Sequence, residues 1–399
     1  MSVQQIKKYI TVWVFIAVIF AVGILSAVNL FSAHKEGKIQ SVNSPSGFEN
    51  DFKSNLYLKT EIIEAHGFTQ RLIGNDVVED AELGSIIKTN WGQLTSLPGE
   101  SDLTKFKENL VTITDSCRKN EIPAVYFQAP FKVLPSFEKV ELPIGLTTSA
   151  NKNADSVISM LEAEGADVFD LRTVLEKNDE IPLRKLFFNT DHHWRIETAY
   201  FAFCRSLQYL CEKYDYCSGE LARFLTDENN FRKITMENCY LGSWGRRTGS
   251  AFAGLDDFTY FVPDFATDIS IKRIAGEAHY EATGDFYNVV MSPKRVEKEQ
   301  NGPSVEELAA GYGNGIYTDL YSVYMDGYTA EMQIMNNSVA SEKRILIFHD
   351  SFGFPFSSFM SLSAKETRVI DLRNWHEDIG EYISEYKPDL VLMIYNPDQ

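Results

Sequence analysis

Two short segments, far apart in the sequence, carry side chains that can act together in acyl transfer. They are Asp191-His192-His193-Trp194 and His349-Asp350-Ser351-Phe352-Gly353. A serine hydroxyl is a poor nucleophile until a neighbouring base takes its proton, and an imidazole held by a carboxylate can be that base. Asp191 and His193 are two residues apart, so in an extended segment their side chains point to the same side. We therefore predict that Asp191 orients His193 and that His193 faces Ser351.

Ser351 directly follows the apolar run 344–348 (RILIF), which predicts a buried strand. In a parallel α/β sheet, sites form at the carboxyl ends of strands, where backbone N–H groups of the next helix point outward. We therefore expect the N–H groups of Ser351 and of its neighbours Phe352 and Gly353 to stabilise an oxyanion.

Three further side chains are expected near this site. Trp194 is predicted to wall it, and His192 is predicted to point away from it. Arg373 also follows a predicted strand, in the segment Asp371-Leu372-Arg373-Asn374-Trp375, and is a candidate for lining the site.

Both segments also have a purely structural interpretation. Asp191 to His193 can be a polar loop that caps the following helix, because Asp is a favoured N-cap residue. Ser351 can be only a turn residue, and His349 is interpreted as a hydrogen-bonded histidine at a strand end. A metal site built from Asp191, His193, His349 and Asp350 is chemically conceivable. No metal-ligand spacing such as H-x-x-x-H is present, so we predict no metal and no cofactor.

The segment 241–249 (LGSWGRRTG) is dense in glycine and arginine. Its residues suit contact with a substrate or an acyl group. This composition is more typical of a surface turn, which is the interpretation that we favour.

Apolar runs and helical patterns alternate along the chain, which indicates βαβ crossovers and a parallel sheet. The predicted strands are 122–127, 166–171, 344–348, 369–372 and 390–395, and the predicted helices are 154–164, 197–214 and 376–386. The stretch 219–341 has shorter, β-rich segments. We expect it to be an insertion within one α/β domain spanning 53–399, with a separate small domain as the alternative.

Near the N-terminus, residues 9–31 carry no charge and are long enough to cross a bilayer core of about 30 Å as a helix. Lys7 and Lys8 precede this stretch and favour a cytoplasmic tail over residues 1–8. The polar stretch 32–52 predicts a linker. We expect a single-pass anchor in the cell membrane, with a cleaved signal peptide as the alternative. In both cases the remaining chain is exported.

The composition of the 399 residues restricts the partners of the protein. A hydrophobic share of 44% is ordinary for a globular chain. The formal net charge of −18 argues against a broad basic face, so we predict no nucleic-acid partner.

The chain has five cysteines, an odd number for an exported protein. Cys217 is close enough in sequence to pair with Cys211 or with Cys239, and the sequence does not decide between them. For Cys204 and Cys211, on a predicted helix, buried free thiols are the simpler interpretation. No CxxC pair is present, so a zinc ribbon is not indicated.

The DHHW tetrapeptide at 191–194 and the strand followed by His349-Asp350-Ser351-Phe352 resemble the DHHW family of bacterial exported proteins. More broadly, the chain is similar to the alginate O-acetyltransferase branch (AlgJ and AlgX type) of the SGNH hydrolase superfamily. The resemblance covers most of the chain after the predicted linker. It implies an SGNH-hydrolase-like parallel sheet flanked by helices, with Asp191, His193 and Ser351 as a catalytic triad. The chain departs from the family pattern at His349, where glycine is typical.

The resemblance also implies an activity: an extracytoplasmic O-acetyltransferase that modifies a cell-wall or secreted polysaccharide through an acyl-serine intermediate. It implies a membrane-bound O-acyltransferase as the supplier of acetyl groups. A carbohydrate acetyl esterase is an alternative, because transferases and esterases share the acyl-serine step. A non-catalytic, membrane-anchored assembly factor is a third possibility, and the histidine at position 349 keeps it open.

Overall fold

An eight-stranded sheet forms the centre of the protein, with the strand order β5-β4-β13-β11-β12-β10-β8-β9. The computed structural model describes residues 3–35, 52, 56–80, 83–276, 278–296, 315–327 and 329–397. The strands from β5 to β12 run parallel, and β10, β8 and β9 continue the sheet in antiparallel fashion. The strands are β4 (Ala124–Gln128), β5 (Asp167–Asp170), β8 (Ile269–Ala275), β9 (Ala278–Gly284), β10 (Glu331–Asn336), β11 (Arg344–His349), β12 (Glu366–Ile370) and β13 (Leu390–Tyr395).

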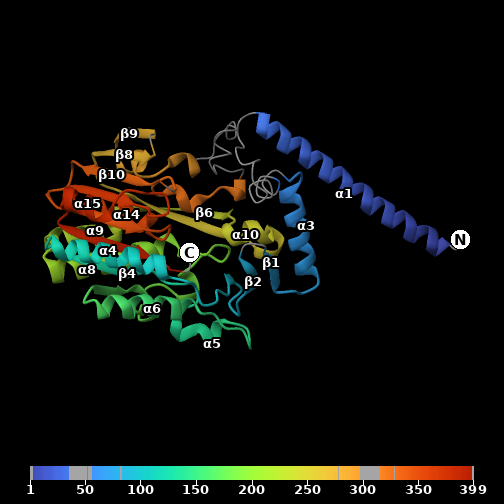
Figure 1. Ribbon diagram of the computed structural model, residues 1–399, viewed down its shortest axis with the longest axis horizontal. Coiled ribbons are helices and arrows are strands. Elements are labelled where there is room, and N and C mark those ends of the chain that lie inside the picture. The colour runs from blue at the N-terminus through green and yellow to red at the C-terminus, as the bar shows by residue number, and fades with distance from the viewer. Residues whose placement is uncertain are drawn as a thin grey trace.

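Helices cover both faces of this sheet (Figure 1). Val125 and Phe127 of β4 pack in the layer with α8 (Ile196–Tyr214) and α14 (Gly353–Met360). Tyr126 packs in the opposite layer with α4 (Thr104–Lys119), α6 (Ala150–Ala163) and α15 (Ile379–Tyr386). Both faces are buried, which explains why the parallel strands are apolar throughout. Each fully buried large side chain stabilises the fold by about 1.5–3 kcal/mol. The carboxyl ends of these strands can therefore hold the residues of a site in fixed positions.

Smaller elements surround the central sheet. A three-stranded antiparallel sheet and a two-stranded ribbon lie beside it. Their strands are β1 (Val77–Asp80), β2 (Gly84–Lys88) and β3 (Leu94–Ser96), then β6 (Phe231–Tyr240) and β7 (Asp256–Pro263). The further helices are α3 (Lys59–Leu72), α5 (Glu138–Glu141), α7 (Leu171–Glu176), α9 (Gly219–Thr226), α10 (Ser243–Thr248), α11 (Ser250–Ala253) and α12 (Phe286–Val289). Short 3-10 turns are Pro135–Phe137, Leu183–Lys185, Glu228–Asn230, Pro293–Arg295, Gly315–Tyr317 and Leu320–Val323.

The predicted α/β fold with its parallel sheet is confirmed. Several element boundaries differ from the prediction: α6 begins at Ala150 and not at residue 154, and β12 begins at Glu366 and not at residue 369. Two other differences have local reasons. β12 ends at Ile370 and does not reach residue 372, because the Asp371 carboxylate turns the chain by accepting a hydrogen bond from the Arg373 N–H. α15 begins three residues later than predicted, because the Asp378 carboxylate caps it by accepting from the Glu381 N–H.

The stretch 219–341 contains the β-rich segments that its sequence indicates. β6 and β7 form the separate ribbon, whereas β8, β9 and β10 extend the central sheet through the pairing of β10 with β12. Of the described strands of this stretch, β8, β9 and β10 are therefore part of the central sheet, whereas β6 and β7 are not.

The N-terminal helix α1 (Val3–Lys35) projects away from the α/β body (Figure 1). Its part from Val12 to Lys35 is long and apolar enough to cross a membrane. The predicted linker 32–52 is wrong at its start, since residues 32–35 are the last turn of this helix. Basic His34 and Lys35 suit a helix C-terminus, where the backbone dipole is negative. Residues 36–51 lie outside the described part of the chain.

One of the two cysteine pairings that the sequence allows is formed. Cys211 and Cys217 make a disulfide with their Cα atoms 5.2 Å apart, which ties the end of α8 to the loop before α9. Cys211 is therefore not a free thiol, whereas Cys204 is.

α3 lies directly against α10 and α11 (Figure 1). Gly67 faces the Thr248 carbonyl so closely that a Cβ at position 67 would lie 2.1 Å from that oxygen. The Glu64 carboxylate accepts hydrogen bonds from the Ser250 N–H at 2.9 Å and from the Tyr317 hydroxyl at 2.6 Å. Gly67 thus allows α3 to pack closely against α10, and the Glu64 carboxylate ties α3 to α11 at Ser250.

We expect Gly67→Ala to loosen α3 from α10, because the added methyl group has no room against a backbone carbonyl. Overpacking of this kind costs about 1–3 kcal/mol. Thermal unfolding of the full chain, together with hydrogen exchange over α3, measures the effect. Gly219→Ala is the matched control, since a Cβ there meets nothing within 4 Å. Equal melting temperatures for the two variants would contradict this packing.

Candidate active site

Ser351, His193 and Asp191 lie in one hydrogen-bonded line. The Ser351 hydroxyl, just after β11, is 2.8 Å from His193 Nε2, and His193 Nδ1 is 2.6 Å from Asp191 Oδ1. All three residues are buried, at 1%, 6% and 1% exposure. The Nδ1–H of His193 can therefore donate to Asp191 while Nε2 accepts the proton of Ser351. The structure brings together the three residues that the sequence singles out.

Asp191 is held by more donors than its histidine partner alone. Its Oδ1 also accepts from the His193 N–H at 3.0 Å, and its Oδ2 accepts from the Tyr240 hydroxyl at 2.8 Å and the Ser243 N–H at 2.6 Å. Burial raises the pKa of Asp191, but a positive charge on the His193 ring and the hydrogen bonds from His193 outweigh this rise. The pKa therefore lies well below its usual value, and the carboxylate is ionised.

Two buried charged residues hold the loop that carries Asp191. The Lys132 ammonium donates to the backbone carbonyls of Asp191 at 2.6 Å and Asn189 at 3.4 Å. The Asp256 carboxylate accepts from the N–H groups of Asn189 and Thr190, each at 2.8 Å. No motif in the sequence marks either residue. Lys132 could be recognised from the sequence by its position shortly after the predicted strand β4, which ends at the same edge of the sheet as the strand before Ser351.

The segment 241–249 is not a surface turn, and that interpretation is wrong. It begins the helix α10, with Trp244, Gly245 and Thr248 buried. Gly242 lies so close to Asp191 that a Cβ at position 242 would be 2.3 Å from the Asp191 Cβ. The Ser243 hydroxyl is 2.8 Å from His192 Nδ1. Glycine is therefore required at position 242, where the backbone contacts the site loop, whereas Gly249 lies against the backbone of α3 at Ile63.

His192 does not point away from the site, because the 191–193 segment bends and does not run extended. Its ring centroid is 3.7 Å from that of His193. Tyr321 also stacks on His193, with centroids 3.8 Å apart and planes 10° apart. Burial, and then the charge of His193, lowers the pKa of His192 to about 3, so this imidazole stays neutral. Both rings restrict rotation of the His193 side chain.

Trp194 stands behind these rings. It has no exposed surface, its Nε1–H donates to the Tyr321 hydroxyl at 3.0 Å, and its ring packs on Phe352. Trp194 therefore packs in the core behind the site, and its side chain has no exposed surface that a substrate could contact.

The N–H groups of Phe352 and Gly353, expected to face an oxyanion, are already occupied. The Phe352 N–H donates to Asp350 Oδ1 at 2.9 Å, and the Gly353 N–H donates to the Asp350 carbonyl at 3.0 Å. Asp350 Oδ2 in turn accepts from the Asn396 N–H at 2.6 Å. Burial raises the pKa of Asp350 to about 6. Among the described residues, the Ser351 N–H has no hydrogen-bond acceptor, which makes it the donor available beside the hydroxyl.

The departure from the family pattern at His349 does not displace Ser351. The His349 ring lies against Gly353, where a Cβ would be 2.4 Å from its Nδ1. That nitrogen is 3.3 Å from the Ser357 hydroxyl, and burial lowers the pKa of His349 to about 4. The ring is a neutral core group at the strand end, as expected.

The metal-ligand groups that come together are not the set considered from the sequence. Asp191, His192 and His193 have ligand atoms within 4.8 Å of one another, and His349 and Asp350 are not part of that group. The oxygens of Asp191 already accept four hydrogen bonds, so hydrogen bonding accounts for the arrangement.

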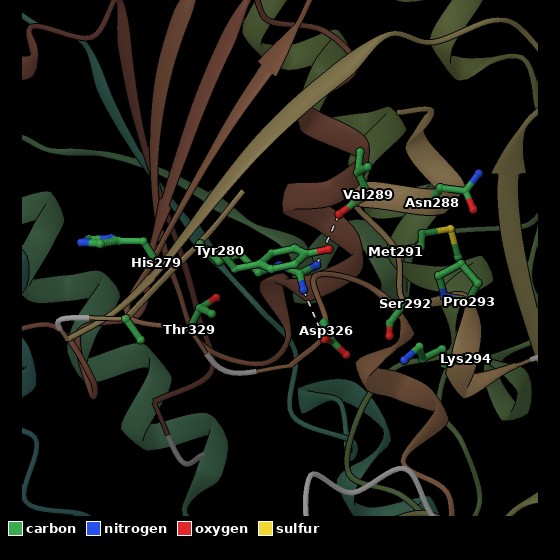
Figure 2. A pocket seen from close by; sticks show the side chains of 12 residues that line it. His279, Tyr280, Asn288, Val289, Met291, Ser292, Pro293, Lys294, Asp326 and Thr329 are labelled. Carbon is green, nitrogen blue, oxygen red and sulfur yellow. Dashed lines mark hydrogen bonds and ion pairs between the residues drawn. The ribbon is translucent and has the colours of Figure 1, made fainter. Parts of the chain in front are cut away.

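The described residues line several cavities near the sheet. One of about 540 Å³ is lined by Asp350, Asp371 and Arg373, so Arg373 lies beside the residue before the serine. Its guanidinium pairs with Asp371 at 2.8 Å. Another of about 490 Å³, shown in Figure 2, is lined by Arg273, Tyr280 and other residues at the β8–β9 hairpin. Its lining includes neither Ser351 nor the 191–193 loop.

Lys132 is accompanied by a second buried ionisable group, Glu141, which is 1% exposed. Burial raises the pKa of Glu141 to about 7, and Lys132 partly opposes this rise. Burial lowers the pKa of Lys132 to about 8, while Asp256, Asp191 and Glu141 oppose that fall. The charges of Lys132 and Glu141, and with them the hold of Lys132 on the loop at residues 189–191, therefore depend on pH.

We expect stability to depend on Glu141 as pH rises. Because its folded-state pKa lies above the usual 4.5, its contribution is complete below pH 4.5 and is lost as pH rises through about 7. Relative to Glu141→Gln, the natural protein should lose about 2 kcal/mol of unfolding free energy between pH 4.5 and 8. Urea unfolding at several pH values measures this. Exposed Glu162→Gln is the control, and parallel profiles for Glu141→Gln and the natural protein would show that burial of Glu141 has no such effect.

The sequence matches no family model and no curated protein. Among solved structures, the protein is similar to Bacillus cereus PatB1 with a sulfonyl adduct, at a TM-score of 0.59 and 18% identity. That match covers 81% of this chain and 97% of PatB1. It is also similar to a DHHW family protein from Eubacterium siraeum DSM 15702, at a TM-score of 0.55 and 17% identity, covering 80% and 92% of the two chains. The resemblance inferred from the DHHW tetrapeptide thus extends to three dimensions: this chain has the fold of a DHHW family protein and of PatB1.

Proposed function

We propose that this protein is an extracytoplasmic, serine-dependent O-acetyltransferase that acts on a cell-wall or secreted polysaccharide. One observation carries the proposal: the Ser351 hydroxyl lies 2.8 Å from His193 Nε2, and the other ring nitrogen lies 2.6 Å from Asp191. A nucleophile, a base and an orienting carboxylate in this order are the parts that acyl transfer needs.

The reaction proceeds in two steps. First, Ser351 Oγ attacks the acetyl carbonyl of a donor ester while His193 Nε2 takes its proton. The tetrahedral intermediate collapses, the donor oxygen leaves with that proton, and acetyl-Ser351 remains. Second, a sugar hydroxyl gives its proton to His193 and its oxygen attacks the acetyl carbonyl. The bond between the carbonyl carbon and Ser351 Oγ then breaks, and His193 gives the proton to Oγ, which restores the Ser351 hydroxyl. Ionised Asp191 stabilises the imidazolium in both steps, and the Ser351 N–H faces the oxyanion.

The N-terminal helix supports the proposed location, and the family resemblance supports the proposed polysaccharide and acyltransferase partners. We infer that residues 9–31 anchor the chain, that residues 1–8 are cytoplasmic, and that the domain at 53–399 lies outside. The Cys211–Cys217 disulfide supports an oxidising compartment. The partners are then the bilayer, a polysaccharide acceptor and a membrane-bound O-acyltransferase that supplies acetyl groups.

Two alternatives differ at a single step each. A carbohydrate acetyl esterase would use water in place of the sugar hydroxyl in the second step. A non-catalytic assembly factor would keep the fold without the first step. The solved structure of PatB1 carries a sulfonyl adduct, which recommends a sulfonyl fluoride as a probe for an activated nucleophile here.

Ser351→Ala should lower the release of acetate from a chromogenic acetyl ester by about 10³-fold or more, because it removes the nucleophile. The same substitution should abolish labelling by a sulfonyl fluoride, as read by mass spectrometry of the full chain in detergent. Ser358→Ala, a buried serine on α14, is the control and should retain both activities.

An added oligosaccharide separates the alternatives. Faster ester consumption with acetylated sugar as the product supports the transferase, whereas unchanged release of free acetate supports the esterase. Absence of both labelling and ester cleavage in the natural protein contradicts the enzymatic proposal and leaves the assembly factor.

A further inference from the structure

The cavity of about 540 Å³ beside Asp350 lies at the carboxyl ends of β11, β12 and β13. The start of α4, from Asp102 to Phe106, lines it from the other side. Ligands of open α/β sheets bind in the crevice outside these strand ends. The volume is within the range of about 300–1,000 Å³ that small-ligand sites have.

The wall of this cavity is continuous with the nucleophile. Asp350 lines it and directly precedes Ser351. The two carboxylate oxygens of Asp350 accept from the N–H groups of Phe352 and Asn396. A ligand in the cavity therefore touches a backbone turn that is fixed relative to the reacting hydroxyl.

The lining combines aromatic rings with hydrogen-bonding groups. Trp375, Phe106 and Tyr395 all line the cavity, and the last two rings are in edge contact at 5.2 Å. Asn109 and His376 are among the polar side chains around them. Rings that offer an apolar face beside polar atoms suit a sugar, which has apolar C–H faces and hydroxyl edges.

Two residues of this lining carry a buried polar atom that has no hydrogen-bond partner among the described residues: Trp375 at Nε1 and Tyr395 at its hydroxyl. These residues are 7% and 6% exposed. An unsatisfied buried polar group costs about 1–3 kcal/mol, so native structures rarely keep two of them in one place without a use. One donor and one group that both donates and accepts can bind ligand hydroxyls.

The charges of the lining select against an anionic ligand. Four carboxylates line the cavity against two cations, Lys105 and Arg373. The guanidinium of Arg373 is also paired with Asp371, through Nε at 2.9 Å and Nη2 at 2.8 Å. A neutral, hydroxyl-rich ligand meets no repulsion there.

We propose that this cavity binds a neutral sugar unit of the polysaccharide acceptor, next to the unit that is acetylated. The Trp375 ring and its Nε1–H, together with the Tyr395 hydroxyl, recognise that unit. The inference rests on the proposed acyl-serine function for its role in transfer, but binding itself does not require catalysis.

Direct binding tests the cavity apart from the chemistry. Full-length Ser351→Ala protein in detergent is titrated with cellopentaose, chitopentaose and xylopentaose, and with an anionic alginate oligomer, by saturation-transfer NMR. At least one neutral sugar should bind, and more tightly than the alginate oligomer. On this background, Trp375→Phe and Tyr395→Phe together should weaken binding about 10-fold, since each keeps an aromatic ring at its position and loses one hydrogen bond. Tyr280→Phe, in the cavity of Figure 2, should change nothing.

Catalysis then tests the role of the bound sugar. With Ser351 present, the Trp375→Phe and Tyr395→Phe variants should raise the KM for the acceptor about 10-fold, with sulfonyl fluoride labelling of Ser351 unchanged. Asn109→Trp, at a half-buried position of the wall, blocks the cavity without altering the core and should act in the same way.

Three results would overturn the inference: no neutral sugar binds, the alginate oligomer binds more tightly, or the cavity variants bind as the parent does. Loss of labelling at Ser351 in the natural protein contradicts the proposed function instead, and leaves the binding result to be judged separately.

Discussion

The buried carboxylate of Asp191 is the constraint on which the surroundings of the site depend. An ionised carboxylate in the core is stable only when its lone pairs are filled by donors. Asp191 receives four hydrogen bonds: two from His193, one from Tyr240 at the end of β6 and one from Ser243 at the start of α10. Two separate parts of the chain, residues 191–193 and residues 240–243, must therefore meet at one side chain. The glycine at position 242 follows from this, because only a residue without Cβ lets α10 begin so close to Asp191.

The same requirement connects the site to the N-terminal part of the protein. α10 carries Ser243 at one end, and near its other end Thr248 meets Gly67 of α3. The Glu64 carboxylate fixes the same helix pair by capping α11 at Ser250. α3 is the first long helix described after α1, so the element nearest the proposed membrane anchor also supports the helix that holds Asp191. Packing strain between Gly67 and Thr248 is therefore expected to shift α10 and with it the residues that hold Asp191, although no residue of α3 contacts the triad in the described structure.

The sequence predicts the parts of this protein that depend on local pattern. β13 is recognisable because a strand buried on both faces must be apolar throughout, and Asp191 and His193 are recognisable because their spacing and residue types suit a triad. What the sequence does not show depends on residues that approach from elsewhere. Lys132 is a single lysine without a motif, and its role exists only because the 189–191 loop folds over it. The occupied N–H groups after Ser351 depend on the turn made by the Asp350 carboxylate, and sequence patterns do not specify that rotamer.

The histidine at position 349 shows how a departure from a family pattern can be absorbed. Glycine there would leave space under the first turn of α14, and the imidazole fills that space. The glycine at position 353 then supplies the room that the ring needs, since a Cβ would clash with it at 2.4 Å. The hydroxyl of Ser351 still reaches His193 at 2.8 Å. A neutral, buried ring also places no charge beside the serine. For these reasons the histidine gives no structural ground for regarding the site as inactive.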